Sequence, residues 1–184
     1  MKKTNIACLA LASLLFIISS TNVQAQNTDV KSAVYHQKDY IGENPTADQD
    51  LKIFADYENA CVSGDSVKAR SLLADDYKGY GPGPSDSTTA EQVMNWWSQN
   101  YKTQSNRKVN FVEETYRVIK GDYKGNWVAM WGEYDCTING KDIRVPFQST
   151  AQITNGKINF TTSYWDNWSV YQALGYTLTP PNTN

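Results

Sequence analysis

The chain has 184 residues, a formal net charge of −2 and an aromatic content of 12%. This length suits one domain with a hydrophobic core. Charges that are dispersed and slightly acidic do not form the basic surface that nucleic acid or an anionic membrane requires, so we expect neither as a partner. The single histidine, His36, is too few for a His/Cys metal site or a Ser-His-Asp hydrolase, and we predict no metal and no cofactor.

The N-terminus has the pattern of a secretory signal peptide. Lys2 and Lys3 precede an apolar run at residues 6–19, and residues 23–25 fit a small-residue cleavage site. We therefore predict cleavage near Ala25 and export to the periplasm or the medium, with no membrane insertion afterwards. Residues 26–45 are predicted to be a leader segment or a short docked helix. The folded domain is expected at residues 46–178, followed by a tail at 179–184.

Helical periodicity begins at residue 46 and predicts a helix over residues 46–63, capped by Thr46 or Asp48 and ended by Gly64. The residues that recur at three- and four-residue steps are Leu51, Phe54, Ala55, Tyr57, Glu58, Cys61 and Val62. Asp65 or Ser66 would cap a second helix, which completes a helical hairpin. After an extended piece at residues 77–83, Thr88 and Glu91 form a capping box for a third helix that runs to about Tyr101.

From Arg107 the period changes to two, which predicts strands at residues 107–119, 126–138, 141–154 and 158–164. Asn139-Gly140 and Asn155-Gly156 are hairpin turns, and Pro146 predicts a bulge or an edge. Helices followed by a meander indicate an α+β fold, with helices on one face of a strongly curved antiparallel sheet in a single domain. Cys61 and Cys136 fall on different elements, and we favour two buried thiols over a disulfide.

Asp166 lies where the last strand ends, between Trp165 and Trp168 and just before a short helix at residues 169–174. Two interpretations stay open. The carboxylate either caps the following helix or acts as a general base whose pKa the neighbouring tryptophans raise by desolvation.

The order and spacing of these motifs resemble the nuclear transport factor 2-like superfamily, and within it the SnoaL-like and ketosteroid-isomerase-like branches. The resemblance covers about residues 46–178. It rests on the Gly64-Asp65 corner, residues 72–76, the ending Tyr164-Trp165-Asp166 and the tail at residues 172–175. It implies a cone-shaped sheet whose concave side, closed by the helices, holds an apolar pocket. The superfamily has many activities, so the resemblance implies no particular reaction.

The resemblance also implies roles for individual residues. Tyr57 falls where the steroid isomerases place a phenol that donates to the enolate oxygen, and Gln148 falls at their second oxyanion donor. Their general base falls on Gly81, which cannot take up a proton. The SnoaL-like cyclases place an aspartate near the end of the meander, where this chain has Asp166.

Three functions follow as alternatives. The first is a pocket that binds a small apolar or carbohydrate-like ligand, with Tyr80, Trp97, Trp131 and Tyr164 as candidate contacts. The second is a proton-abstracting isomerase or cyclase with Asp166 as its base and Tyr57 and Gln148 as donors. The third is a domain that forms a homodimer.

Overall fold

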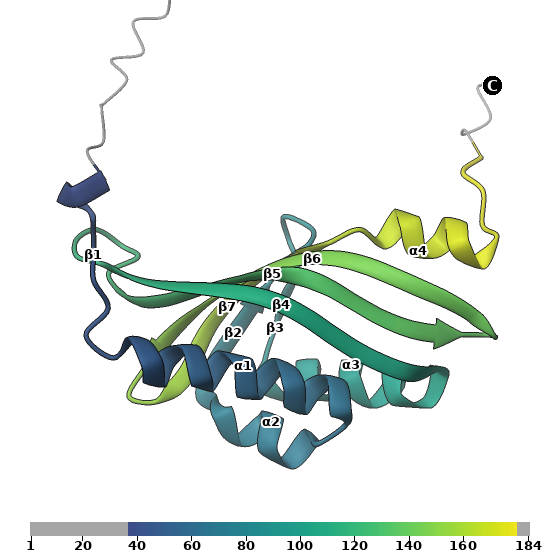
Figure 1. The fold of residues 1–184 in the computed structure, drawn as a ribbon, viewed down its shortest axis with the longest axis horizontal. Helices are drawn as coiled ribbons and strands as arrows, with labels where there is room; N and C mark the ends of the chain where they lie inside the picture. The colour runs from purple at the N-terminus through teal and green to yellow at the C-terminus, as the bar shows by residue number, and fades with distance from the viewer. Residues whose placement is uncertain (1–36, 180–184) are drawn as a thin grey trace, which may run out of the picture. The chain divides into compact units, whose positions relative to one another are not determined.

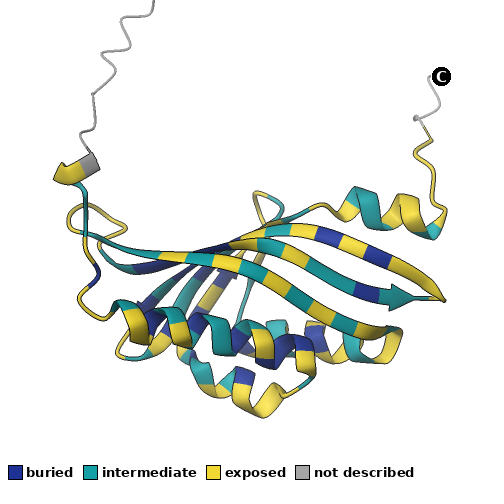
Figure 2. Ribbon diagram, viewed as in Figure 1, coloured by how far each residue is buried: buried dark blue, intermediate teal, exposed yellow. Residues whose placement is uncertain are grey.

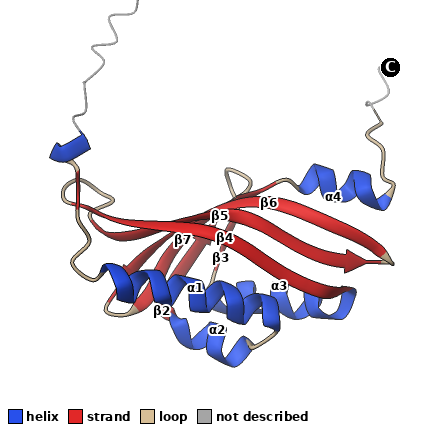
Figure 3. Cartoon of the chain, viewed as in Figure 1, coloured by secondary structure: helices blue, strands red, loops and turns tan. Residues whose placement is uncertain are grey.

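A computed structural model describes residues 37–179 of the chain; the predicted signal peptide, residues 26–36 and residues 180–184 lie outside this range. Figures 1 and 3 show the helices and strands of the described part. Its helices are a 3-10 turn η1 (Gln37–Asp39), α1 (Ala47–Ser63), α2 (Ser66–Leu72), α3 (Ala90–Thr103) and α4 (Asn167–Leu174). Its strands are β1 (Ile41–Gly42), β2 (Leu73–Tyr80), β3 (Ser87–Thr88), β4 (Gln104–Val118), β5 (Gly125–Ile138), β6 (Lys141–Thr154) and β7 (Lys157–Trp165).

Within residues 37–179 the strands form a seven-stranded sheet in the order β1-β4-β5-β6-β7-β2-β3. The four longest strands are the predicted antiparallel meander, and β2 joins β7 in a parallel pairing. Helix α1 packs on β4 and β5, α2 packs on α1, and α3 packs on β2, so these helices cover one face of the sheet (Figure 1). The α+β fold predicted from the sequence is confirmed.

The core lies between this helical layer and the inward face of the sheet (Figure 2). Because strand side chains alternate between the two faces, Val128 and Met130 of β5 point toward the helices and are fully buried. A second, smaller cluster joins Cys136, Ile143 and Val145 to α4. Cys61 and Cys136 are both free and buried, which confirms the expected pair of thiols.

A buried polar cluster anchors the start of α1. The Asp50 carboxylate is 3% exposed and accepts hydrogen bonds from Thr46 Oγ1 (2.7 Å), Asn44 Nδ2 (2.8 Å) and Asn126 Nδ2 (3.2 Å). Thr46 is the N-cap, but its hydroxyl donates to Asp50 instead of accepting from the helix. Asn44 and strand β1, which pairs with β4, belong to the segment predicted as a leader, so part of that segment packs on the domain.

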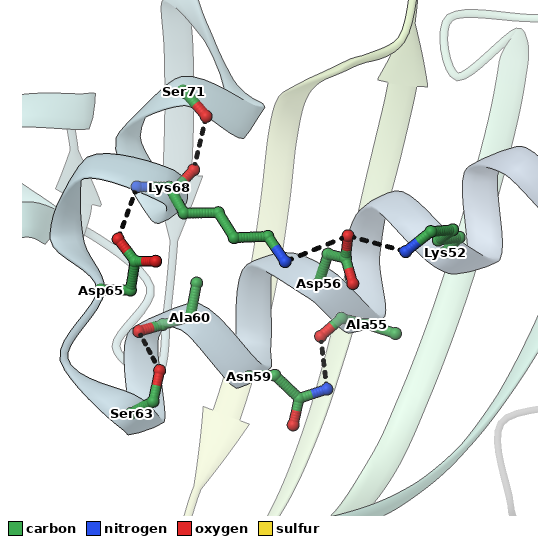
Figure 4. Close-up of polar contacts among 9 residues, drawn as sticks. All are labelled: Lys52, Ala55, Asp56, Asn59, Ala60, Ser63, Asp65, Lys68 and Ser71. Atoms are coloured by element: carbon green, nitrogen blue, oxygen red, sulfur yellow. Dashed lines mark hydrogen bonds and ion pairs between the residues drawn. The ribbon is translucent and has the colours of Figure 1, made fainter.

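The helical hairpin of α1 and α2 is stabilised by local polar contacts (Figure 4). Asp65 is the N-cap of α2 and accepts a hydrogen bond from the Lys68 backbone N–H (3.0 Å). Asp56 pairs on the surface with Lys52 (2.9 Å) and Lys68 (3.3 Å). Gly64 ends α1 in the left-handed region, at a φ of 93°. The hairpin predicted from the sequence is therefore formed as expected, with Asp65 in the capping role.

We expect Asp65→Ala to lower the free energy of unfolding by about 1 kcal/mol, because it leaves a backbone donor of α2 without its acceptor. Asp56→Ala is a comparison variant, since it removes two surface ion pairs that contribute about 0.2–1 kcal/mol each and touches no cap. Urea unfolding of both variants measures the difference. An Asp65→Ala protein as stable as the wild type would contradict the assigned cap.

Two local predictions differ from the structure, and the structure decides between the two alternatives for Pro146. The capping box of α3 is Thr89 with Gln92, one residue after the predicted pair Thr88 and Glu91, because Thr88 pairs in β3. Strand β2 begins at Leu73, four residues earlier than the predicted extended piece. Pro146 makes no bulge: β6 is continuous there, and its pairing with β7 begins only at Phe147, so the proline lies on a free edge.

Within residues 37–179, the helices are too short or too polar to cross a membrane.

Candidate functional site

A cavity of about 690 Å³ opens between the helical layer and the inward face of the sheet. Helices α1 and α3 form one side of it, β2 and β5–β7 form another, and Val170 of α4 closes one end. Its aromatic lining includes Tyr57, Tyr77, Trp96, Trp97, Tyr134 and Trp165. The volume is in the range of small-molecule sites, and an aromatic lining with few polar groups is typical of them.

The aromatic wall is built by α3 and the neighbouring strands. Trp97 contacts Tyr134 of β5 edge to face, with ring centroids 6.0 Å apart, and Trp96 of α3 lies 6.1 Å from Trp165 of β7. The rings of Trp96 and Trp97 also contact each other, with centroids 5.0 Å apart. These rings connect the helix to two strands, so the wall is fixed in place by packing.

Several polar side chains of the cavity are hydrogen-bonded to one another. The Tyr77 hydroxyl lies 2.6 Å from Thr161 Oγ1, and Ser149 Oγ lies 2.7 Å from Ser163 Oγ. The Tyr134 hydroxyl donates to Gln104 Oε1 at 2.6 Å. These pairs satisfy groups that would otherwise be buried without partners.

Glu58 is the cavity carboxyl that has no such partner. It lies on α1, lines the cavity and is partly buried, and within residues 37–179 its carboxylate has no hydrogen bond or ion pair. Burial raises the pKa of this carboxyl from 4.5 to about 7, because less water solvates its charged form. Burial likewise raises the pKa of Tyr77 to about 12, and the nearby Glu58 charge adds to that rise. Glu58 is thus a carboxyl that is half ionised near neutral pH.

The position of Glu58 in the sequence is itself a signal that the prediction did not use. Glu58 is four residues after Phe54 and three before Cys61, so it lies within the apolar stripe of α1. A charged residue on the buried face of an amphipathic helix is unusual and marks a paired or functional group.

Three of the candidate residues from the sequence line the cavity. Tyr57 is 4% exposed and Trp97 is 9% exposed, and both are part of the core. Burial raises the pKa of Tyr57 well above its ordinary value, so its hydroxyl stays protonated as a donor. Tyr80 reaches the cavity from the end of β2, although its ring packs on Phe160, with centroids 5.1 Å apart.

Three other candidates lie on the opposite face of the sheet. Trp131, Gln148 and Tyr164 form one cross-strand row through β5, β6 and β7, and all three are exposed. Their sequence neighbours Met130 and Ser149 point inward. Because a step of one residue along a strand changes the face, these three side chains do not enter the cavity. Alternation showed which residues share a face but not which face is covered by helices.

Asp166, the candidate base from the sequence, lies outside the cavity. It is the N-cap of α4, where Oδ1 accepts hydrogen bonds from the backbone N–H groups of Trp168 (2.9 Å) and Ser169 (3.1 Å). The residue is exposed and does not line the cavity. The geometry therefore supports the capping interpretation, and the carboxyl inside the cavity is that of Glu58.

The structure explains why Gly81 has no side chain. A Cβ atom there would lie 2.2 Å from the backbone oxygen of Ser163, and the φ of 93° is unfavourable for other residues. A base at this position, as in the resemblance drawn from the sequence, has no room. Within the described range, no group of three or more His, Cys, Asp or Glu side chains is arranged to hold a metal ion.

No protein-family model and no curated protein matches this chain. Solved structures do match. One is a protein from Catenulispora acidiphila with a ketosteroid isomerase-like fold, solved with trimethylamine, at 21% identity and a TM-score of 0.55, covering 70% of this chain and 97% of that one.

Another match is IdmH from Streptomyces antibioticus, a proposed polyketide cyclase, at 18% identity and a TM-score of 0.55, covering 68% of this chain and 98% of that one. A third is PrhC from Penicillium brasilianum, at 12% identity and a TM-score of 0.59, covering 70% of this chain and 87% of that one. The chain has the nuclear transport factor 2-like fold. Its matches include SnoaL-like and ketosteroid-isomerase-like proteins, which confirms the resemblance in fold that the sequence predicted.

Proposed function

We propose that the cavity binds a small, largely apolar molecule and that Glu58 exchanges a proton with it. One observation carries this proposal: a carboxyl with a pKa of about 7 lines an aromatic cavity and has no partner in the described part of the chain. A general acid or base works best when its pKa is near the working pH, because both protonation states are then populated. Perturbed carboxyls in clefts are typical of such sites.

The surrounding groups suit a proton transfer. An ionised Glu58 would accept a proton from a bound molecule, and Tyr57 and Tyr77 supply hydroxyl groups that stay protonated through the physiological range. A hydroxyl donor beside a base stabilises negative charge that develops on a substrate oxygen. The aromatic walls lower the polarity around Glu58, which strengthens both interactions.

Base strength in the cavity can be tested without knowing the natural substrate. The probe is 5-nitrobenzisoxazole, in which a base removes the proton on carbon, a nitrile forms and the ring N–O bond breaks to release a phenolate. We expect the protein to accelerate this reaction, with a rate that rises as Glu58 ionises and is half-maximal near pH 7. Glu58→Gln should lower the rate by roughly 10²-fold or more.

Asp166→Asn is the matched control, because asparagine keeps an N-cap oxygen for α4 and the residue lies outside the cavity. It should retain the wild-type rate and pH profile. A normal rate in Glu58→Gln, or a lost rate in Asp166→Asn, would show that the base is not Glu58.

A further inference from the structure

The charge of the cavity lining is entirely acidic. Among the described residues that line it, none is Lys, Arg or His, and the two carboxylates are Glu58 and Asp86. Asp86 is engaged at the rim, where its carboxylate accepts a hydrogen bond from the Gly83 backbone N–H (2.8 Å). A negatively charged ligand would thus meet only like charge in a desolvated site, which is strongly unfavourable.

Of the two carboxyls that line the cavity, Glu58 is the one whose carboxylate forms no hydrogen bond within residues 37–179. Tyr77 is paired with Thr161, and the hydroxyls of Ser149 and Ser163 are paired with each other. An ionised carboxylate that is partly buried is stabilised by a cation or by several donors, which offset its desolvation. Since no cationic side chain lines the cavity among the described residues, a positive charge on the ligand is the natural complement.

The aromatic wall is suited to the same charge. Indole and phenol rings attract cations through the negative potential of their faces, and tryptophan does so most strongly. Trp96, Trp97 and Trp165 are linked in one set of ring contacts along the cavity, and Tyr134 extends it. A site with several such rings and one carboxylate matches the arrangement that recognises substituted ammonium groups.

We propose that the ligand of this cavity is an amine or ammonium compound with an apolar body, whose cationic nitrogen pairs with Glu58 and lies against the aromatic wall. The inference rests on the proposed function, because it needs the cavity and Glu58 to bind the ligand. It also specifies the proton exchange. A neutral tertiary amine takes the proton of protonated Glu58 on its nitrogen lone pair, leaving an ion pair. A quaternary ammonium ion instead causes Glu58 to release that proton to solvent.

Two probes of equal shape separate charge from hydrophobicity. Benzyltrimethylammonium carries the cation, and 2,2-dimethylpropylbenzene replaces its nitrogen with carbon and is neutral. Quenching of tryptophan fluorescence measures binding directly and needs no catalysis. At pH 8 we expect the cation to bind at least tenfold more tightly than its isostere. The preference should fall toward pH 5.5, as Glu58 becomes protonated.

The other titratable groups near Glu58 do not produce this pH dependence. Tyr57 and Cys61 on α1 and Tyr77 on β2 have pKa values raised by burial. Tyr134 and Cys136 on β5 are shifted in the same direction for the same reason, so all of these groups remain protonated below pH 8. Asp86 at the rim is present in both the wild type and Glu58→Gln. A difference in pH dependence between the two proteins therefore comes from Glu58.

Glu58→Gln should lose most of the preference for the cation and all of its dependence on pH, whereas Asp166→Asn should keep both. Calorimetric titration of benzyltrimethylammonium at pH 6.5 in two buffers of different ionisation enthalpy should show proton release, and the release should be absent in Glu58→Gln. Equal binding of the two probes to the wild type overturns the inference and leaves the proposed cavity intact. If neither probe binds, the inference and the proposed binding function both fail.

Discussion

Glu58→Gln should stabilise the protein at pH 8 by up to about 3 kcal/mol and change its stability much less at pH 4. The carboxyl has a pKa of about 7 when folded and near 4.5 when unfolded. Between these values the unfolded chain loses the proton while the folded chain keeps it, so the free energy of unfolding falls as pH rises. The loss is complete above pH 7, and each pKa unit corresponds to about 1.4 kcal/mol.

Urea unfolding of the two proteins at several pH values tests this prediction. Each protein gives a curve of the free energy of unfolding against pH. Every other titrating group is common to both proteins, so the difference between the two curves reports the ionisation of Glu58. The amide introduced by Glu58→Gln has no partners either, but the cost of burying it shifts the curves by a constant and does not change their slope. If the two curves run parallel from pH 4 to pH 8, then the folded carboxyl has an ordinary pKa, and the main support for the proposed function is lost.

Gly132→Ala should lower the free energy of unfolding by about 3 kcal/mol or prevent folding. The reason is the close approach of β4 to β5 at this position. A Cβ atom on Gly132 would lie 2.0 Å from the backbone oxygen of Asn110 and 2.7 Å from Cα of Phe111. Both atoms belong to the backbone of the paired strand, so a rotamer change cannot relieve the clash, and the sheet itself has to shift.

Gly121→Ala is the matched control for this variant. The site has a φ of 87° but no atom within 4 Å of the added Cβ, so the variant should lose only about 1–2 kcal/mol from backbone strain. Thermal unfolding of both variants gives the comparison. A Gly132→Ala protein as stable as Gly121→Ala would show that β4 and β5 do not approach this closely.

The fold was predictable because its signals are periodic and local. The apolar stripe around Phe54, the Asn139-Gly140 and Asn155-Gly156 turns and the alternating strands each specify an element from nearby residues. The parallel partner of β2 was not predicted. Leu73 and Ile158 are far apart in the sequence, and no local pattern specifies which strand edge accepts a distant segment.

The site was predicted less well than the fold, for two physical reasons. Their aromatic type makes Trp131 and Tyr164 candidate ligand contacts, but the position of the helices decides which side of a strand lines the cavity. Asp166 drew attention because it lies between tryptophans, yet a carboxylate one residue before a helix is also well placed to cap it. Glu58 lies within the apolar stripe of α1, and the periodicity that predicts the helix does not distinguish it from the core residues around it. Tyr57 and Trp97 line the cavity as proposed, since both lie on buried helix faces.

The parallel pairing of β2 with β7 has a consequence for the order in which the chain folds. The hairpins of β4 through β7 join neighbouring segments, and such contacts close quickly because the loops between them are short. Strand β2 comes early in the sequence, but its partner β7 follows some 80 residues later (Figure 1). The pairing of β2 therefore has to close a long loop. The Tyr77–Thr161 contact across this pairing is therefore among the last to form. A chain that ends before β7 can form the helical hairpin and part of the meander, but it lacks the β2–β7 pairing whose residues line the cavity with Glu58.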